Sequence, residues 1–188
     1  MTDQEQALVT LADLLDDRGI PYMVIGGLAN AVWGIPRATL DVNVTIWTEP
    51  AQPEEAIPLF DGPFRIRPSD PRTFVRETRV LPLESPSGVR VDVIFGLLPF
   101  EAEAIRRGVP REVAGRPVRF CSAEDLILLK IVSDRPRDQA DVQGILARRR
   151  STLDRTYLDP RIDELASLLD RREIREAYER GLREQPKS

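Results

Sequence analysis

Residues 22–46 read YMVIGGLANAVWGIPRATLDVNVTI, and this stretch carries the strongest signal for the fold. The apolar run from Tyr22 to Ile25 has the composition of a strand, and it leads directly into the pair Gly26-Gly27. The pattern then predicts a short helix over residues 28–34 and an alternating strand from Asp41 to Trp47. Strand, glycine turn, helix and second strand in this order indicate an α/β or α+β core.

The glycine pair is the first candidate for ligand binding. Glycines between a strand and a helix let the backbone approach a phosphate closely, and the helix N-terminus that follows offers unpaired N–H groups and a partial positive charge. Gly26 and Gly27 are therefore candidates for binding nucleotide phosphates. A tight strand-to-helix turn without any ligand explains the same two glycines equally well.

Three oxygen-bearing side chains are candidates for holding metal. Asp41 and Asn43 are two residues apart in an alternating strand, so both point to one face, about 7 Å apart. Asp92 interrupts the apolar strand VRVDVIF at residues 89–95, where a lone carboxylate needs a partner. On neighbouring strands, these three residues would hold a pair of Mg²⁺ ions. Polar residues of an edge strand that faces water are the alternative interpretation.

Further charged residues follow in the same order along the chain. Arg37, four residues before Asp41, has the charge to neutralise a triphosphate. Lys130 interrupts an apolar helix and either reaches into a cleft or extends to the surface. Asp138 and Asp141 lie one turn apart at the start of the next helix, where they would stabilise its positive end. Taken singly, each of these residues also fits a purely structural role.

The composition excludes several kinds of chemistry. The 188 residues include no histidine and one cysteine, Cys121, which excludes serine–histidine and cysteine–histidine catalysis, histidine-ligated zinc and an internal disulfide. The net charge of −4 does not indicate a general DNA-binding surface. No apolar run reaches the length of about 18 residues that crosses a membrane. We therefore expect a cytoplasmic protein that uses carboxylates, lysine, arginine, hydroxyls and a hard metal.

The rest of the chain predicts a mixed sheet followed by helices. The pattern indicates strands at residues 79–84, 89–95 and 117–120, and helices at residues 4–18, 101–107, 123–134, 136–150 and 171–183, with another helix capped by Asp159-Pro160. The proline-rich stretch 48–72 predicts one weak helix among loops, and the tail from Gln185 is expected to fray. We expect a core over residues 1–120 and a helical C-terminal lobe, packed on it, over residues 121–188.

Three segments together resemble the minimal nucleotidyltransferases of the polymerase-beta-like superfamily, and most closely the abortive-infection (AbiEii-type) toxin branch. The segments are VIGGLANAVWGIPRATLDVNV, VRVDVIFG and CSAEDLILLKIVSDRPRDQADV, at residues 24–44, 89–96 and 121–142. They are similar to the family's glycine motif with its Asp-x-Asp, its third carboxylate strand, and its lysine helix with the acidic residues that follow. The resemblance implies the nucleotidyltransferase fold, a mixed sheet flanked by helices.

The resemblance also implies a role for each matching residue. Asp41, the residue at position 43 and Asp92 would bind two Mg²⁺ ions, and Asp92 would help to activate the acceptor hydroxyl. Gly26 and Gly27 would hold the phosphates of a nucleoside triphosphate, while Lys130, Asp138 and Arg37 would help to place the nucleotide. A nucleoside monophosphate would move to the acceptor, and pyrophosphate would leave.

Position 43 departs from the family pattern, because Asn43 stands where the motif has Asp. An amide offers a carbonyl oxygen to a metal but lacks the charge that holds two divalent ions close together. This loss predicts a rate lower by ~100-fold or more in the chain as it stands. The chain is either a specialised or inactivated natural member or one in which an Asp was replaced.

Three functions follow as hypotheses. The first is a toxin-type nucleotidyltransferase of a toxin–antitoxin or phage-defence system, acting on RNA (tRNA) or on a protein hydroxyl and opposed by a cognate antitoxin. The second is a transferase that modifies an antibiotic or another small molecule. The third is a nucleotide-binding or partner-binding module that kept the fold and lost the metal site, for which Asn43 is the best support.

Overall fold

The computed structural model describes residues 1–48 and 52–183. The chain divides into two compact units. The first unit comprises Met1–Leu28 and Ala38–Cys121, and the second comprises Ala29–Arg37 and Ser122–Ser188. The second unit thus includes a short segment from the middle of the glycine–carboxylate stretch, in addition to the helices that follow Cys121.

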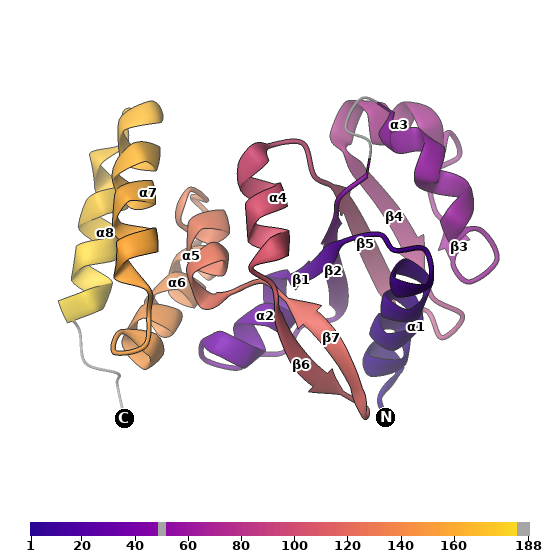
Figure 1. The fold of residues 1–188 in the computed structure, drawn as a ribbon, viewed down its shortest axis with the longest axis horizontal. Helices are drawn as coiled ribbons and strands as arrows, with labels where there is room; N and C mark the ends of the chain where they lie inside the picture. The colour runs from indigo at the N-terminus through magenta and orange to yellow at the C-terminus, as the bar shows by residue number, and fades with distance from the viewer. Residues whose placement is uncertain (49–51, 184–188) are drawn as a thin grey trace. The chain divides into compact units, whose positions relative to one another are not determined.

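A seven-stranded mixed sheet forms the centre of the first unit (Figure 1). The strand order is β3-β4-β5-β2-β1-β7-β6. β2 pairs in parallel with β5, β1 pairs in parallel with β7, and the other neighbours are antiparallel. The strands are β1 (Tyr22–Ile25), β2 (Asp41–Ile46), β3 (Arg65–Ile66), β4 (Val80–Glu84), β5 (Arg90–Phe95), β6 (Val109–Val113) and β7 (Arg116–Phe120).

The two faces of this sheet differ in chemistry. Alternation along β2 and β5 sends one set of side chains to a fully buried apolar face: Val42, Val44, Ile46, Val91, Val93 and Phe95. The opposite face carries Asp41, Asn43 and Asp92, which are only partly buried. Burial of the apolar face fixes the register, because a slip by one residue would turn every side chain over. The same register therefore fixes the positions of Asp41, Asn43 and Asp92 on the polar face.

Four helices accompany the sheet in the first unit. They are α1 (Asp3–Asp17), the 3-10 helix η1 (Pro53–Phe60), α3 (Pro71–Thr78) and α4 (Pro99–Arg106). Thr2 caps α1 by accepting a hydrogen bond from the Glu5 N–H, and the Glu5 carboxylate accepts one from the Thr2 N–H in return. α1 contacts β2 and β7, and α3 contacts η1 and β4. The short α2 (Gly26–Trp33) leads the chain from the first unit into the second.

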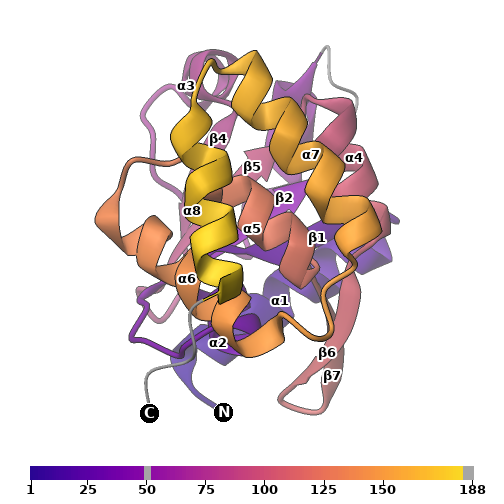
Figure 2. The ribbon, with the colours of Figure 1, turned by 90° about the vertical axis from the view of Figure 1, so that its left-hand side faces the viewer.

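The second unit is helical (Figure 2). It contains α5 (Ala123–Ile131), α6 (Pro136–Arg149), α7 (Arg155–Leu168) and α8 (Arg172–Arg183). Ser122 caps α5 as the sequence predicts, because its hydroxyl accepts a hydrogen bond from the Asp125 N–H at 3.0 Å. α8 packs against both α6 and α7. Among the described residues, no helix is long and apolar enough to cross a membrane.

Several sequence predictions need correction. Asp159-Pro160 does not cap a helix: Asp154 caps α7 and Pro160 lies inside it. The strand β6 and the helix α3 were not predicted: β6 exposes most of its residues and contains a proline, and α3 begins at the end of the proline-rich stretch 48–72 and continues over residues for which no element was predicted. The predicted loop at 49–51 and the predicted frayed tail beyond residue 183 lie outside the described residues.

Candidate active site

The carboxylates of the sheet lie on its two central neighbouring strands. In the parallel pair β2–β5, Asn43 stands directly opposite Asp92, and Asp41 stands opposite Arg90. Paired residues of neighbouring strands point to the same face, and the strands are about 4.8 Å apart. Asp41, Asn43 and Asp92 therefore share the polar face of one sheet, as the strand patterns predict.

Asp92 is partly buried in this position, and its electrostatics reflect the neighbouring carboxylate. Burial raises the pKa of Asp92 above its ordinary value, and the negative charge of Asp41 raises it further. The guanidinium groups of Arg67 and Arg90 act in the opposite direction on this pKa but do not cancel the shift. Two carboxylates that repel one another at a partly buried site favour the binding of a proton or a cation between them.

The glycine pair lies at the first two positions of α2, so the helix begins two residues earlier than predicted. Gly26 has a φ of +69°, a conformation that residues with side chains rarely adopt. A Cβ on Gly26 would lie 3.1 Å from Nδ2 of Asn43, and a Cβ on Gly27 would lie 2.4 Å from Oγ1 of Thr39. Close packing within the protein therefore requires both glycines, independently of any phosphate.

A Mg²⁺ ion fits this donor set better than a pair of ions does. Two carboxylates and one amide carbonyl on a single face are hard oxygen ligands of the kind that Mg²⁺ prefers. Within the described part of the chain, however, no three acidic, histidine or cysteine residues come together as a metal site. Two negative charges balance one divalent ion, and a second ion would depend on the phosphates of a bound nucleotide.

A second cluster of charges lies in the second unit. Arg37 donates two hydrogen bonds to Asp141, from Nε to Oδ1 at 2.8 Å and from Nη2 to Oδ2 at 2.7 Å. The ammonium group of Lys130 lies 2.5 Å from Oδ1 of Asp138 and 2.9 Å from Oδ2 of Asp141. Asp138 also accepts a hydrogen bond from the Ser133 hydroxyl at 2.8 Å. Arg37, Lys130, Asp138 and Asp141 thus form a connected network, which we call the Lys130 network.

The centre of the Lys130 network is buried, and both of its carboxyl groups are stabilised as carboxylates. The side chains of Lys130 and Asp141 are 9% and 4% exposed. Burial opposes the ionisation of Asp138 and Asp141. Hydrogen bonds from Lys130 and Ser133 outweigh this effect and lower the pKa of Asp138, and hydrogen bonds from Arg37 and Lys130 lower the pKa of Asp141. Arg37 and Lys130 then face two anions, and the exposed Arg135 adds a third cation, with its Nε 3.4 Å from Oδ2 of Asp138. From the sequence, Asp141 was expected only to stabilise the start of its helix. Arg37 lies 104 residues earlier in the chain, and no sequence pattern indicates that the two residues are in contact.

The predicted site residues therefore form two groups. Gly26, Gly27, Asp41, Asn43 and Asp92 lie in the first unit, where the register and the close contact of Gly26 with Asn43 bring them together. Arg37, Lys130 and Asp138 lie in the second unit, joined through Asp141. Their roles in catalysis and nucleotide binding remain predictions.

The architecture matches known nucleotidyltransferase folds. No protein-family model matches the chain, and no curated protein sequence matches it. It is similar to the solution structure of the antibiotic-resistance factor ANT(2'')-Ia (TM-score 0.56, 19% identity, over 90% of this chain and 96% of that one). It is also similar to an antigenic nucleotidyltransferase-like protein from Paracoccidioides brasiliensis (TM-score 0.54, 17% identity, over 94% of this chain and 92% of that one). A third similar structure is the lincosamide antibiotic adenylyltransferase LnuA in its lincomycin-bound form (TM-score 0.50, 14% identity, over 77% of this chain and 96% of that one). At these identities the likeness establishes the fold: a seven-stranded mixed sheet flanked by helices.

Proposed function

We propose that this protein is a Mg²⁺-dependent nucleotidyltransferase that moves a nucleoside monophosphate from a nucleoside triphosphate onto a hydroxyl group. The observation that carries the proposal is the placement of Asp41, Asn43 and Asp92 on one face of the central strands of a nucleotidyltransferase-type sheet. The proposal assigns the triphosphate to the adjoining start of α2, where Gly26 and Gly27 bring the backbone close to Asn43.

Each residue has a distinct part in the proposed reaction. Asp41, Asn43 and Asp92 would hold the metal ion, which would neutralise phosphate charge and polarise the phosphoryl group. Asp92 would also help to activate the acceptor hydroxyl by accepting its proton. The hydroxyl oxygen then bonds to the α-phosphorus, and the bond from that phosphorus to the pyrophosphate oxygen breaks. Arg37, Lys130 and Asp138 are proposed to place the nucleotide.

For the acceptor, the comparisons favour a small molecule. ANT(2'')-Ia and LnuA are described as an antibiotic-resistance factor and an antibiotic adenylyltransferase, and the alignment covers 96% of the length of each. The AbiEii-type toxin function, with RNA (tRNA) or a protein as acceptor and a cognate antitoxin as partner, is the second candidate. It rests on the resemblance of the three sequence segments, including the two glycines and the lysine helix.

Label transfer tests the enzymatic proposal directly. The protein, its Asn43→Asp form and its Asp92→Asn form would be incubated with labelled nucleoside triphosphates, Mg²⁺ or Mn²⁺, and either total RNA or a set of hydroxyl-bearing small molecules. We expect transfer by the unmodified protein, faster transfer by Asn43→Asp, and none by Asp92→Asn. The absence of both label transfer and nucleotide binding in the first two proteins would contradict the proposal.

A non-catalytic nucleotide-binding module is the remaining alternative, and Asn43 is the observation that favours it. Triphosphate affinity separates the two cases, because the enzyme would bind the nucleotide together with its metal. The proposed transferase loses much of its triphosphate affinity when EDTA removes Mg²⁺. A module without a metal site would show the same affinity with and without EDTA.

A further inference from the structure

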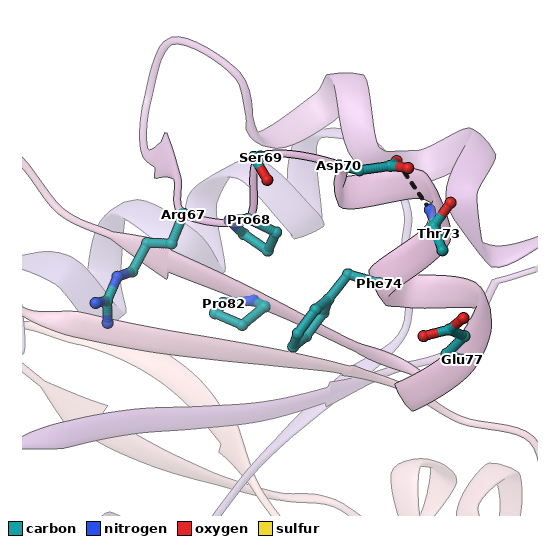
Figure 3. Close-up of a pocket in the computed structure, with 8 residues that line it drawn as sticks. All are labelled: Arg67, Pro68, Ser69, Asp70, Thr73, Phe74, Glu77 and Pro82. Atoms are coloured by element: carbon teal, nitrogen blue, oxygen red, sulfur yellow. Dashed lines mark hydrogen bonds between the residues drawn. The ribbon is translucent and has the colours of Figure 1, made fainter.

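An open pocket of about 530 Å³ lies in the first unit, and one of its lining residues, Pro82, is on the strand next to that of Asp92. Its lining comes from the segment that follows β3, from α3 and from β4 (Figure 3). Its volume falls within the range of about 300 to 1,000 Å³ that is typical of small-molecule sites. None of the residues proposed above for the metal or the nucleotide lines this pocket.

The register connects the pocket to Asp92 step by step. Arg67 donates its backbone N–H to the carbonyl of Pro82 at 3.0 Å, which continues the β3–β4 pairing by one residue. Pro82 stands directly opposite Asp92 in the β4–β5 pair. Both pocket residues therefore belong to the polar face, one and two strand spacings of about 4.8 Å from Asp92. The influence of the Arg67 charge on the Asp92 carboxyl agrees with this short separation.

The strand order places the pocket on one side of the carboxylates and the glycines on the other. Asp41 and Asn43 are on β2 and Asp92 is on β5, and the pocket borders β4 next to β5. Gly26 follows β1, which lies on the other side of β2. A triphosphate held at the glycines and a molecule held in the pocket would approach the carboxylates from opposite sides, as two partners of an in-line displacement must.

The lining has the chemistry of a site for a ring with a charged substituent. Phe74 is 38% exposed and lies beside Pro82 in the middle of the pocket, between Arg67 at one end and Glu77 at the other (Figure 3). Asp70 is engaged in capping α3, since it accepts a hydrogen bond from the Thr73 N–H at 3.1 Å. Within the described residues Glu77 forms no ion pair, so its carboxylate is available to a ligand.

We propose that this pocket is the acceptor subsite of the protein and takes a small amine that carries an apolar ring and a hydroxyl group; this rests on the proposed transferase function. The ring packs on Phe74 and Pro82, which offer an aromatic and an aliphatic surface. The ammonium group turns toward Glu77 and away from Arg67, because like charges repel. The hydroxyl group at the other end of the ring is thereby directed away from Glu77, over the polar face that carries Pro82 and, on the next strand, Asp92.

Three phenols that differ only in one substituent test the ligand class: tyramine, 4-ethylphenol and 4-hydroxyphenylacetate. Each is titrated into the ¹⁵N-labelled full chain without nucleotide or metal, to about 10 mM, where a ligand of this size is expected to bind. We expect tyramine to shift amide signals in residues 67–77 at the lowest concentration, 4-ethylphenol at a higher one, and 4-hydroxyphenylacetate least of all.

Two variants and a control connect binding to the pocket. Phe74→Ala should weaken tyramine binding by about three- to tenfold through the lost ring contact. Glu77→Gln should weaken it by about two- to fivefold and remove the preference for tyramine over 4-ethylphenol. Leu169→Ala, at a leucine that is 47% exposed in the second unit, should leave tyramine binding unchanged. Thermal unfolding confirms that each variant is folded.

The outcomes separate this proposal from the proposed function. No tyramine shifts in residues 67–77, or equal binding of the amine and the acid, would overturn the pocket assignment even if label transfer to some acceptor is observed. Shifts in these residues caused by RNA and not by tyramine would overturn it in favour of a nucleic-acid acceptor. Pocket binding of tyramine without label transfer to any acceptor would support the ligand class and contradict the transferase.

Discussion

At the scale of single residues, the site is short of negative charge for two metal ions. Asp41 and Asp92 supply two charges, and Asn43, directly opposite Asp92, supplies only an amide. The contact between Asn43 and Gly26 also shows that residue 43 sits where the strand meets the start of α2. A change of charge at this one position would therefore affect both the proposed metal ion and the proposed phosphate site.

Replacing Asn43 with Asp should convert the site into a stronger metal site. We expect tighter Mg²⁺ binding and a transfer rate higher by roughly 100-fold, because a third carboxylate stabilises the charge that develops in the transition state. Without metal the variant should unfold at a lower temperature than the unmodified protein, since three carboxylates repel one another. Thermal unfolding with and without Mg²⁺ measures this. Asn43→Ala is the control and should show neither gain, whereas equal Mg²⁺ responses in all three proteins would contradict the expectation.

The raised pKa of Asp92 predicts how stability depends on pH. A carboxyl whose pKa is higher in the folded state favours folding at pH values below its ordinary pKa, and this contribution is lost as the pH rises through the raised pKa. Asp92→Asn should therefore be more stable than the unmodified protein at pH 7, by less than about 1 kcal/mol after allowance for solvent screening. Urea unfolding at pH 7 and near pH 4 should show the difference shrinking in acid. A difference that grows in acid would contradict the assignment.

At the scale of elements, the start of α2 is a tightly packed junction of the proposed site. The helix begins at Gly26 immediately after β1, and Gly27 faces the side chain of Thr39 just before β2. A Cβ at position 27 would come within 2.6 Å of the Thr39 Cβ, which cannot rotate away. A serine at position 27 would meet the same obstacle, because it also carries a Cβ.

The double-mutant cycle of Gly27→Ala and Thr39→Gly tests this packing. Gly27→Ala alone should destabilise the protein by about 1–3 kcal/mol through overpacking. When Thr39→Gly removes the opposing side chain, the same Gly27→Ala change should cost much less. Chemical denaturation of all four proteins gives the coupling free energy. Strictly additive effects would show that position 27 is limited by something other than Thr39.

At the scale of the whole molecule, the chain passes between its two units three times, and the segment Ala29–Arg37 belongs to the second unit. Arg37 anchors one end of this segment through Asp141. Arg149 of α6 anchors the middle by donating hydrogen bonds to the carbonyls of Val32 and Trp33, at 3.0 and 3.2 Å. The second unit is therefore stabilised by contacts between residues more than 100 positions apart.

Asp141→Asn should loosen the second unit. Removing this carboxylate breaks the ion pairs of Asp141 with Arg37 and Lys130 and leaves Lys130 paired with Asp138, at a cost of about 3 kcal/mol for a buried pair. Because the pKa of Asp141 is lowered, its stabilisation is present above the ordinary carboxyl pKa and is lost as the pH falls through the lowered value. Hydrogen exchange should increase in residues 29–37. Asp134→Asn, at a carboxylate that is 85% exposed, is the control and should change little.

The sequence predicted those parts of the fold that depend on local pattern. The alternation in β2 and β5 fixes the face of Asp41, Asn43 and Asp92, because the apolar set must be buried. Similarly, Ser122 and Pro136 mark the starts of α5 and α6 through capping and backbone geometry.

Features that depend on tertiary contacts were not predicted from the sequence. β6 exposes most of its residues and gains strand geometry only by pairing with β7. Asp159-Pro160 has the local appearance of a helix start, whereas Asp154 caps α7 five residues earlier. The role of Asp141 depends on Arg37, which is 104 residues away, and no local pattern encodes such a contact. The pocket around Phe74 likewise depends on α3, a helix that was not predicted from the sequence.

The pocket residues all come from positions 67–82, an uninterrupted stretch between the two strands that carry the carboxylates. If the pocket holds the acceptor, exchange of residues 67–82 alone would change the compound that is recognised and leave Asp41, Asn43 and Asp92 in place. Selectivity for a different acceptor could then arise in a single genetic step, without any change to the proposed catalytic residues. Chimaeras that swap this stretch between relatives would be the natural way to redirect the protein.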